Sequence, residues 1–178
     1  MPITSTISGR RWPIPEYFTV RIATAADAPT LAGHRAGMFR DMGVLPQQLS
    51  DALVDASRRY FEEAIPLGEY VGWVACLAAR STDVVAGAGV QVRRVLPHPG
   101  VGGREIVLGP QAIVLNVYTE PAWRRRGLAA ILMQRVLDWA SANGVKSLVL
   151  HASDSGRPLY EKLGFVPTNE MRYVGERK

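Results

Sequence analysis

The residues best suited to chemistry in this chain form a basic turn, Arg124-Arg125-Arg126-Gly127-Leu128-Ala129, between a strand-like and a helix-like segment. The first amides of a helix have no partner within the helix and point along the positive end of its dipole, so they attract anions. The arginines add charge and forked donors. Gly127 and Ala129 let an anion approach the backbone closely. The turn predicts either a phosphate site or a solvated basic loop that caps a core helix.

A tyrosine about thirty residues further on is the second candidate for chemistry. It lies in Pro158-Leu159-Tyr160-Glu161-Lys162-Leu163-Gly164-Phe165, a short helical segment that ends in Gly-Phe. A phenol has a pKa near 10, so it can donate a proton at pH 7. The alternative is that Tyr160 is an aromatic side chain packed against Phe165.

Composition limits the class of protein. The chain has 178 residues and a formal net charge of +5, which suits an anionic ligand. Its one cysteine, Cys76, excludes an internal disulfide, and with three histidines we expect no metal site. No apolar run approaches the roughly 18 residues that span a bilayer, and none follows Arg10 and Arg11 as in a signal peptide. We therefore expect a cytoplasmic protein without a membrane partner.

The elements that must position these residues follow in the order strand, two helices, three strands, helix, strand, helix, strand. A tail or arm is expected at residues 1–17 and a single domain at 18–178. Thr24 and Asp27 resemble a capping box at the start of the first helix, which Gly43 ends. The other expected elements are strands at 18–22, 70–79, 84–95, 112–118, 146–151 and 165–174, helices at 47–64, 127–142 and 155–163, a turn at 81–83 and a long loop at 96–110.

These features together resemble the GNAT superfamily of N-acetyltransferases. Arg124-x-x-Gly127-x-Ala129 is similar to the family's acyl-CoA pyrophosphate loop, in which the first position is Arg or Gln and the last is Gly or Ala. The segment Leu115–Pro121 fits the strand and proline before that loop, and Pro158–Phe165 resembles the second family signature. The resemblance covers about 160 residues. It implies an α/β (α+β) fold with a central twisted mixed sheet of about six or seven strands and about four helices.

The resemblance also implies direct transfer of an acetyl group from acetyl-CoA to a primary amine of a small molecule, amino acid or peptide. Tyr160 corresponds to the general acid that protonates the leaving thiolate. The strands at 112–118 and 146–151 are expected to part, so that the pantetheine arm pairs with the main chain beside them. Val117, Tyr118 and Thr119 are expected to pair with the pantetheine arm. The pyrophosphate is expected at the turn, where the cofactor-binding residues are Arg124, Arg125, Arg126, Gly127, Leu128, Ala129 and Ala130. Ser153 is expected as a further contact of the cofactor.

Two departures from the family pattern concern catalysis. Many relatives have Asn and Ala where this chain has Ser153 and Gly156, and Ser153 is expected to hold a water or a cofactor amide. Some relatives have a carboxylate base near position 116, but Asn116 cannot act as a base. His151 is a candidate base, with a structural histidine as the alternative. A second function therefore stays open, an acyl-CoA-binding sensor or scaffold with little or no turnover.

The acceptor side is expected at the first helix. Its apolar stripe, which includes Leu31 and Met38, is interrupted by His34 and Arg35. The first two helices line the acceptor site in GNAT folds, so we expect His34 or Arg35 to face the acceptor. Arg35 would suit a carboxylate or phosphate. The alternative is that both side chains bend to water at the rim of the stripe.

Other partners are less well supported by the sequence. The basic clusters at 93–94, 124–126 and 172–178 are scattered rather than interleaved with aromatic residues, so we expect no nucleic-acid partner. A homodimer is compatible with the fold.

Overall fold

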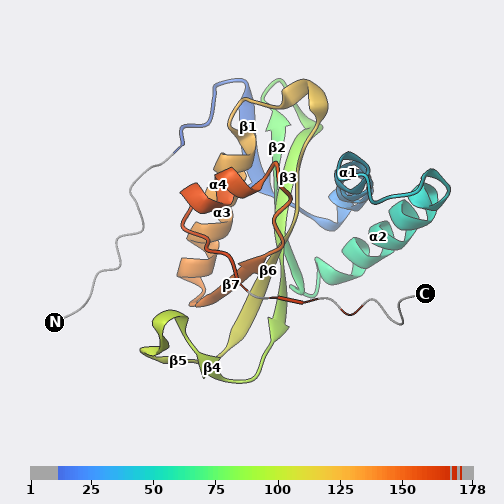
Figure 1. Cartoon of the computed structure of the whole chain (residues 1–178). Helices are drawn as coiled ribbons and strands as arrows, with labels where there is room; N and C mark the ends of the chain where they lie inside the picture. The colour runs from blue at the N-terminus through green and yellow to red at the C-terminus, as the bar shows by residue number, and fades with distance from the viewer. Residues whose placement is uncertain (1–11, 169, 172, 174–178) are drawn as a thin grey trace.

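The computed structural model describes residues 12–168, 170, 171 and 173. A central sheet has the strand order β1-β2-β3-β6-β7. Its strands are β1 (Phe18–Ile22), β2 (Tyr70–Leu77), β3 (Arg80–Arg94), β6 (Pro110–Thr119) and β7 (Ser147–Leu150). β1, β2, β3 and β6 pair antiparallel, and β7 pairs parallel to β6. The sheet is therefore mixed, as expected (Figure 1).

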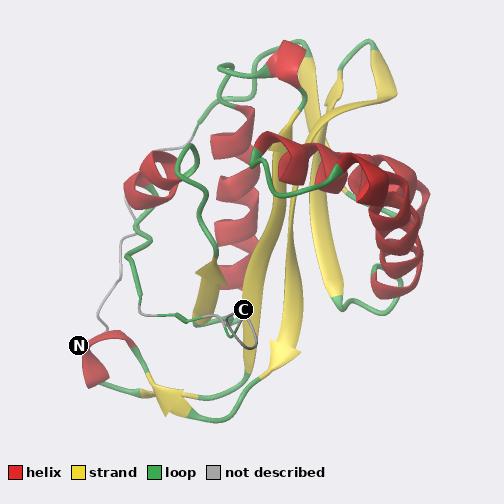
Figure 2. Cartoon of the chain, turned by 45° about the vertical axis from the view of Figure 1, so that its right-hand side comes forward, coloured by secondary structure: helices red, strands yellow, loops and turns green. Residues whose placement is uncertain are grey.

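Helices cover both faces of this sheet (Figures 1 and 2). On one face lie α1 (Ala28–Asp41) and α2 (Ser50–Ala64), and on the other lie α3 (Leu128–Ala142) and α4 (Arg157–Lys162). Strand β2 shows why two cores form. Its successive side chains alternate, so that Trp73 packs in the core with α3 while Val74 packs in the core with α1 and α2. The α/β fold class is confirmed.

The start of α1 is fixed by the expected capping residues. The carboxylate of Asp27 accepts hydrogen bonds from the Thr24 amide at 2.8 Å and the Thr24 hydroxyl at 3.1 Å. Asp27 also forms an ion pair with Arg21 at 2.8 Å. The Arg21 guanidinium holds the pKa of Asp27 below its ordinary value. These contacts join β1 to the helix that follows it.

The sequence-based expectation for the turn between β2 and β3 was wrong. The turn lies at Ala78–Ala79 rather than at 81–83. Residues 81–83 instead form a bulge, because the pairing passes from Leu77 with Arg80 to Cys76 with Val84. An ion pair of 2.9 Å between Arg80 and Asp83 spans the bulge, so the polar residues that suggested a turn are placed in it.

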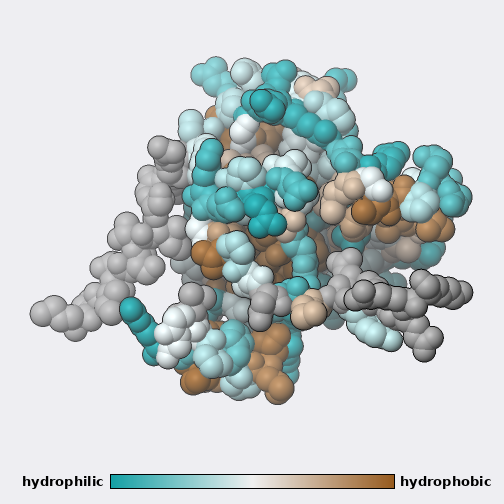
Figure 3. All heavy atoms as spheres, viewed as in Figure 1, coloured by the Kyte–Doolittle hydropathy of each residue, from teal (hydrophilic) through white to brown (hydrophobic). Residues whose placement is uncertain are grey.

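The central sheet has five strands in the described part of the chain, fewer than the expected six or seven. The described residues between 165 and 173 form no strand, and Val166 and Met171 lie exposed rather than packed on the sheet. Two other strands, β4 (His98–Pro99) and β5 (Ile106–Val107), form a separate ribbon within the expected loop at 96–110. Apolar side chains of this region are exposed (Figure 3), and they include Leu96, Ile106 and Leu108.

Residues that precede β1 also contact the core of the domain. Trp12 and Ile14 are partly buried against the core that contains α3.

In the described part of the chain, no helix combines the length and the apolar character needed to cross a membrane.

Candidate functional site

Strands β6 and β7 part in the middle of β6. Their parallel pairing runs from Gln111 with Ser147 to Val114 with Leu150 and ends there. On its other edge β6 stays paired with β3 as far as Thr119. Within the described residues, Leu115–Thr119 thus has no strand partner on the β7 side. Backbone donors and acceptors on such an edge are available to a ligand that carries amides.

A bulge in β6 lies at the point where the two strands part. Gly89 pairs with Leu115 and Gly87 pairs with Tyr118, so one residue of β3 faces two of β6. Asn116 lies in the bulge with a positive φ of 59° and is 2% exposed. Its Nδ2 donates a hydrogen bond of 3.0 Å to the carbonyl of Leu31, which ties β6 to α1. Its Oδ1 is buried without a partner among the described residues.

The basic turn that follows β6 presents free amides. Arg125 and Gly127 have positive φ values of 63° and 79°, and α3 begins directly after Gly127. The first helical hydrogen bond is donated by Ile131 to the carbonyl of Gly127, at 3.1 Å. In the described structure the amides of residues 125–130, which include Arg126, Leu128, Ala129 and Ala130, donate no hydrogen bond. The N-terminus of α3 therefore presents a set of backbone donors that suits an anion.

The arginines of the turn differ in their contacts. Arg124 donates from Nε to the carbonyl of Thr119 at 2.9 Å and forms an ion pair with Asp41 at the end of α1. Its guanidinium also lies 5.5 Å from the centroid of the Tyr118 ring. The side chain of Arg124 thus fixes the turn to β6 and α1. No local pattern in the sequence indicated the contact with Asp41.

Tyr160 lies on α4, beyond β7. Its ring packs edge-on against Phe165 with centroids 6.1 Å apart, and burial raises the pKa of its phenol. A Cβ at Gly156 would lie 2.9 Å from Cε2 of Tyr160, so an alanine at this position would force the ring to shift. The amide of Gly156 donates to Oγ of Ser153 at 3.2 Å, so Ser153 lies at the start of α4. Tyr160 is therefore fixed in position with its phenol protonated at neutral pH.

His34, expected on the acceptor side, and His151, the candidate base, lie in different surroundings. His34 is 1% exposed, and desolvation lowers its pKa to about 4 although Glu120 Oε1 lies 3.4 Å from its Nε2. Glu120 is itself partly exposed and forms no hydrogen bond with the ring, so desolvation prevails and His34 is neutral at pH 7. His151 lies at the surface, with its Nδ1 3.3 Å from Glu170. The side chain of His34 packs against Gly87 and Tyr118.

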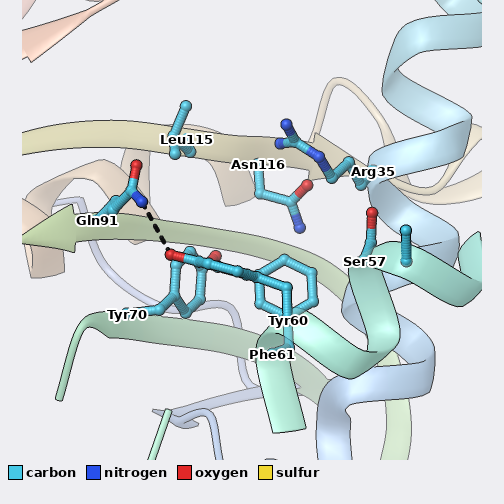
Figure 4. Close-up of a pocket in the computed structure, with 9 residues that line it drawn as sticks. Arg35, Ser57, Tyr60, Phe61, Tyr70, Gln91, Leu115 and Asn116 are labelled. Atoms are coloured by element: carbon cyan, nitrogen blue, oxygen red, sulfur yellow. Dashed lines mark hydrogen bonds between the residues drawn. The ribbon is translucent and has the colours of Figure 1, made fainter. Parts of the chain in front are cut away.

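A pocket of about 280 Å³ lies between α1, α2 and the sheet (Figure 4). Arg35 lines it together with Leu115 and Asn116 of the β6 bulge, so it reaches the place where β6 and β7 part. The structure thus distinguishes two neighbours that were equal candidates in the sequence: Arg35 lines this pocket and His34 does not. Sequence patterns missed the other lining residues, because they come from three separate elements, α2, β2 and β3; these residues are Ala56, Ser57, Tyr60, Phe61, Tyr70 and Gln91.

Comparison with known proteins identifies the family. Residues 43–165 match the model of the acetyltransferase (GNAT) family, and the chain belongs to that family. Aminoglycoside N(6')-acetyltransferase type 1 of Stenotrophomonas maltophilia is 30% identical over 161 residues, which cover 87% of this chain and 90% of that protein. The protein is accordingly an acetyl-CoA-dependent N-acetyltransferase.

Solved structures agree with this assignment. A GCN5-related N-acetyltransferase from Ralstonia eutropha JMP134 has a TM-score of 0.76 and 30% identity, and the match covers 88% of this chain and 97% of that one. An acetyltransferase from Clostridium acetobutylicum, solved with acetyl-CoA, has a TM-score of 0.72 and 26% identity, with 89% and 96% covered. Relatives of this chain therefore bind acetyl-CoA.

Proposed function

We propose that acetyl-CoA lies along the free edge of β6, with its pantetheine arm on the main chain of Val117–Thr119 and its pyrophosphate on the amides of residues 125–130. The main support for this proposal is that the β6–β7 pairing ends at Val114 and Leu150. The rest of β6 therefore has an unpaired edge, and it leads into the turn that carries the free amides. The unpaired edge suits the amides of the arm, and the helix N-terminus suits the pyrophosphate. The arginines of the turn add positive charge around it.

In the proposed reaction a neutral primary amine attacks the thioester carbonyl of acetyl-CoA. A C–N bond forms, the C–S bond breaks, and the amine nitrogen loses a proton to water. Tyr160 donates its phenolic proton to the departing sulfur and regains one from solvent. Burial of Tyr160 keeps the phenol protonated until that step, which suits a general acid. Asn116 supplies no base, so the acceptor must arrive neutral or lose its proton to water.

An aminoglycoside is one candidate acceptor. It is favoured by the sequence identity of 30% with an aminoglycoside N(6')-acetyltransferase.

Replacement of Ala129 by Glu tests the proposed donor site. A carboxylate there would repel the pyrophosphate, whereas it is favourable to the helix itself, because the dipole is positive at that end. We expect Ala129→Glu to weaken acetyl-CoA binding by at least about tenfold, measured by calorimetry, without loss of thermal stability. The control is Ala142→Glu, an exposed position at the other end of α3. Equal acetyl-CoA affinity in the two variants would contradict the proposed site.

Turnover is tested separately by release of the CoA thiol against a panel of amines, amino acids, peptides and aminoglycosides. Stabilisation by acetyl-CoA together with thiol release is the expected result.

A further inference from the structure

The pocket beside the β6 bulge has a charge that constrains the acceptor. Among the described residues that line it, Arg35 alone is charged, and none is Asp or Glu. Figure 4 shows Arg35, Leu115 and Asn116 on one side and the rings of Tyr60, Phe61 and Tyr70 across from them. The pocket is thus a cationic site with a largely aromatic wall.

Arg35 has no carboxylate partner within the described residues. Its guanidinium lies 5.0 Å from the centroid of the Phe39 ring, and burial lowers its pKa from the ordinary value. A partly desolvated cation without a counter-ion is costly, and a ligand anion would relieve that cost. The flat guanidinium matches a carboxylate or a phosphate through two parallel hydrogen bonds.

Two further polar atoms of the pocket residues are buried and have no hydrogen-bond partner in the part of the chain that the structure describes. They are Oδ1 of Asn116 and the hydroxyl of Tyr70, and each belongs to a residue that is at most 2% exposed. The Asn116 oxygen can only accept a hydrogen bond, and it lies in the bulge where the strands part, so it suits the N–H of the acceptor amine. The Tyr70 hydroxyl can donate to an anion. Buried polar atoms of this kind normally have partners, which indicates that a ligand supplies them.

From these observations we infer that the acceptor is a small amine that carries an anionic group, a carboxylate or phosphate, held by Arg35. An aromatic or aliphatic part of this acceptor packs against Tyr60 and Phe61, while its amine lies at Asn116. The inference rests on the proposed function, because it places the amine beside the edge assigned to acetyl-CoA.

The same features disfavour an aminoglycoside. A polycation would meet the Arg35 guanidinium with no acidic residue among those that line the pocket. A volume of about 280 Å³ is at the small end for ligand sites, of which typical volumes are roughly 300–1,000 Å³. The formal net charge of +5 would also repel a polycation at long range. The substrate class of this chain therefore differs from that of its aminoglycoside-modifying relative.

Matched substrates test the role of charge directly. We would compare L-phenylalanine, L-leucine and L-methionine with the amines that remain when the carboxylate is removed, and include kanamycin. The phosphonate analogue of phenylalanine distinguishes phosphate-like from carboxylate recognition. The anionic member of at least one pair should have a kcat/KM at least about tenfold above that of its neutral-tailed counterpart, as expected for a charged hydrogen bond.

Variants then assign this preference to Arg35. Arg35→Met should raise the KM of the anionic acceptor about ten- to a hundredfold, leave its decarboxylated counterpart unchanged and leave the KM of acetyl-CoA unchanged. Arg35→Lys should restore part of the preference, because it keeps the charge. The control is Arg59→Met, which removes an exposed arginine from α2 that does not line the pocket. If Arg35→Met does not fold, the comparison of anionic acceptors with their decarboxylated counterparts in the wild-type enzyme still tests the inference.

The inference is overturned if kanamycin or the decarboxylated amines are used as well as the anionic acceptors. It is also overturned if Arg35→Met keeps the preference, or if none of the anionic acceptors is acetylated although acetyl-CoA stabilises the protein. Absence of any stabilisation of the wild-type protein by acetyl-CoA would instead reject the proposed function. The two failures are therefore distinguishable.

Discussion

Two glycines of α1 provide a matched test of how this helix is held against β6, the strand proposed to bind acetyl-CoA. Gly33 and Gly37 lie one turn apart on the same helix. A Cβ at Gly33 would meet nothing within 4 Å, whereas a Cβ at Gly37 would lie 2.7 Å from the hydroxyl oxygen and 2.8 Å from Cζ of Tyr118. Each glycine costs about 1 kcal/mol of helix propensity relative to alanine. Replacement of either glycine by alanine should therefore give the same gain in helix propensity, and only the replacement of Gly37 adds a close contact with Tyr118.

Gly33→Ala should raise the free energy of unfolding by about 1 kcal/mol, which corresponds to a rise in Tm of about 2–4 °C for a chain of this length. Gly37→Ala gains the same amount but forces the Tyr118 ring to move by about 0.7 Å to reach an ordinary contact distance of 3.4 Å. Overpacking of this kind costs about 1–3 kcal/mol. The net result should lie between no change and a loss of about 2 kcal/mol.

The ring of Tyr118 cannot move freely. It lies 5.2 Å from the His34 ring and 5.5 Å from the Arg124 guanidinium, and it belongs to the free edge of β6. Gly37→Ala should therefore also raise the KM of acetyl-CoA, and Gly33→Ala should not. Urea unfolding and steady-state kinetics of both variants measure these effects. If Gly37→Ala is as stabilising as Gly33→Ala and leaves the KM unchanged, the reasoning is wrong.

Three further predictions concern catalysis, the donor site and pH. Tyr160→Phe should lower kcat at least about 100-fold while acetyl-CoA still raises the Tm, and an unchanged kcat would exclude the role as general acid. Gly127→Ala and Gly144→Ala place alanine at φ values of 79° and 63°, so each should lower the free energy of unfolding by about 1–2 kcal/mol. Only Gly127→Ala should raise the KM of acetyl-CoA, and equal KM values in the two variants would contradict the proposed site. Because the unfolded chain protonates His34 near pH 6.5 and the folded chain only near pH 4, the protein should lose up to about 3 kcal/mol as the pH falls through that range. His34→Gln should reduce this slope in urea unfolding at pH 4.5 to 7, and identical slopes would argue against a buried neutral histidine.

Much of the fold could be predicted from the sequence because its signals are local. The capping residues Thr24 and Asp27 make the expected contacts, and the basic turn lies between a strand and a helix as the periodicity indicated. The β2–β3 turn was misplaced because Ser81–Asp83 has the composition of a turn, whereas the backbone turns at two alanines. Composition alone does not distinguish a turn from a bulge, since both take short polar residues.

The contacts that shape the site are not local. Asp41 binds Arg124, and the amide of Asn116 binds the carbonyl of Leu31 across the interface between α1 and β6. Neither contact follows from the residue types, because nothing in the sequence indicates how α1 is rotated against the sheet.

By itself the sequence determined the proposed donor site. Free amides at a helix N-terminus after a strand follow from backbone geometry, which short segments specify. Only the tertiary structure distinguished the two candidate residues of the proposed acceptor site. His34 and Arg35 are neighbours, but a step of one residue turns an α-helix by about 100°. The packing of α1 on β3 and β6 therefore buries His34 against Gly87 and leaves Arg35 in the pocket beside α2.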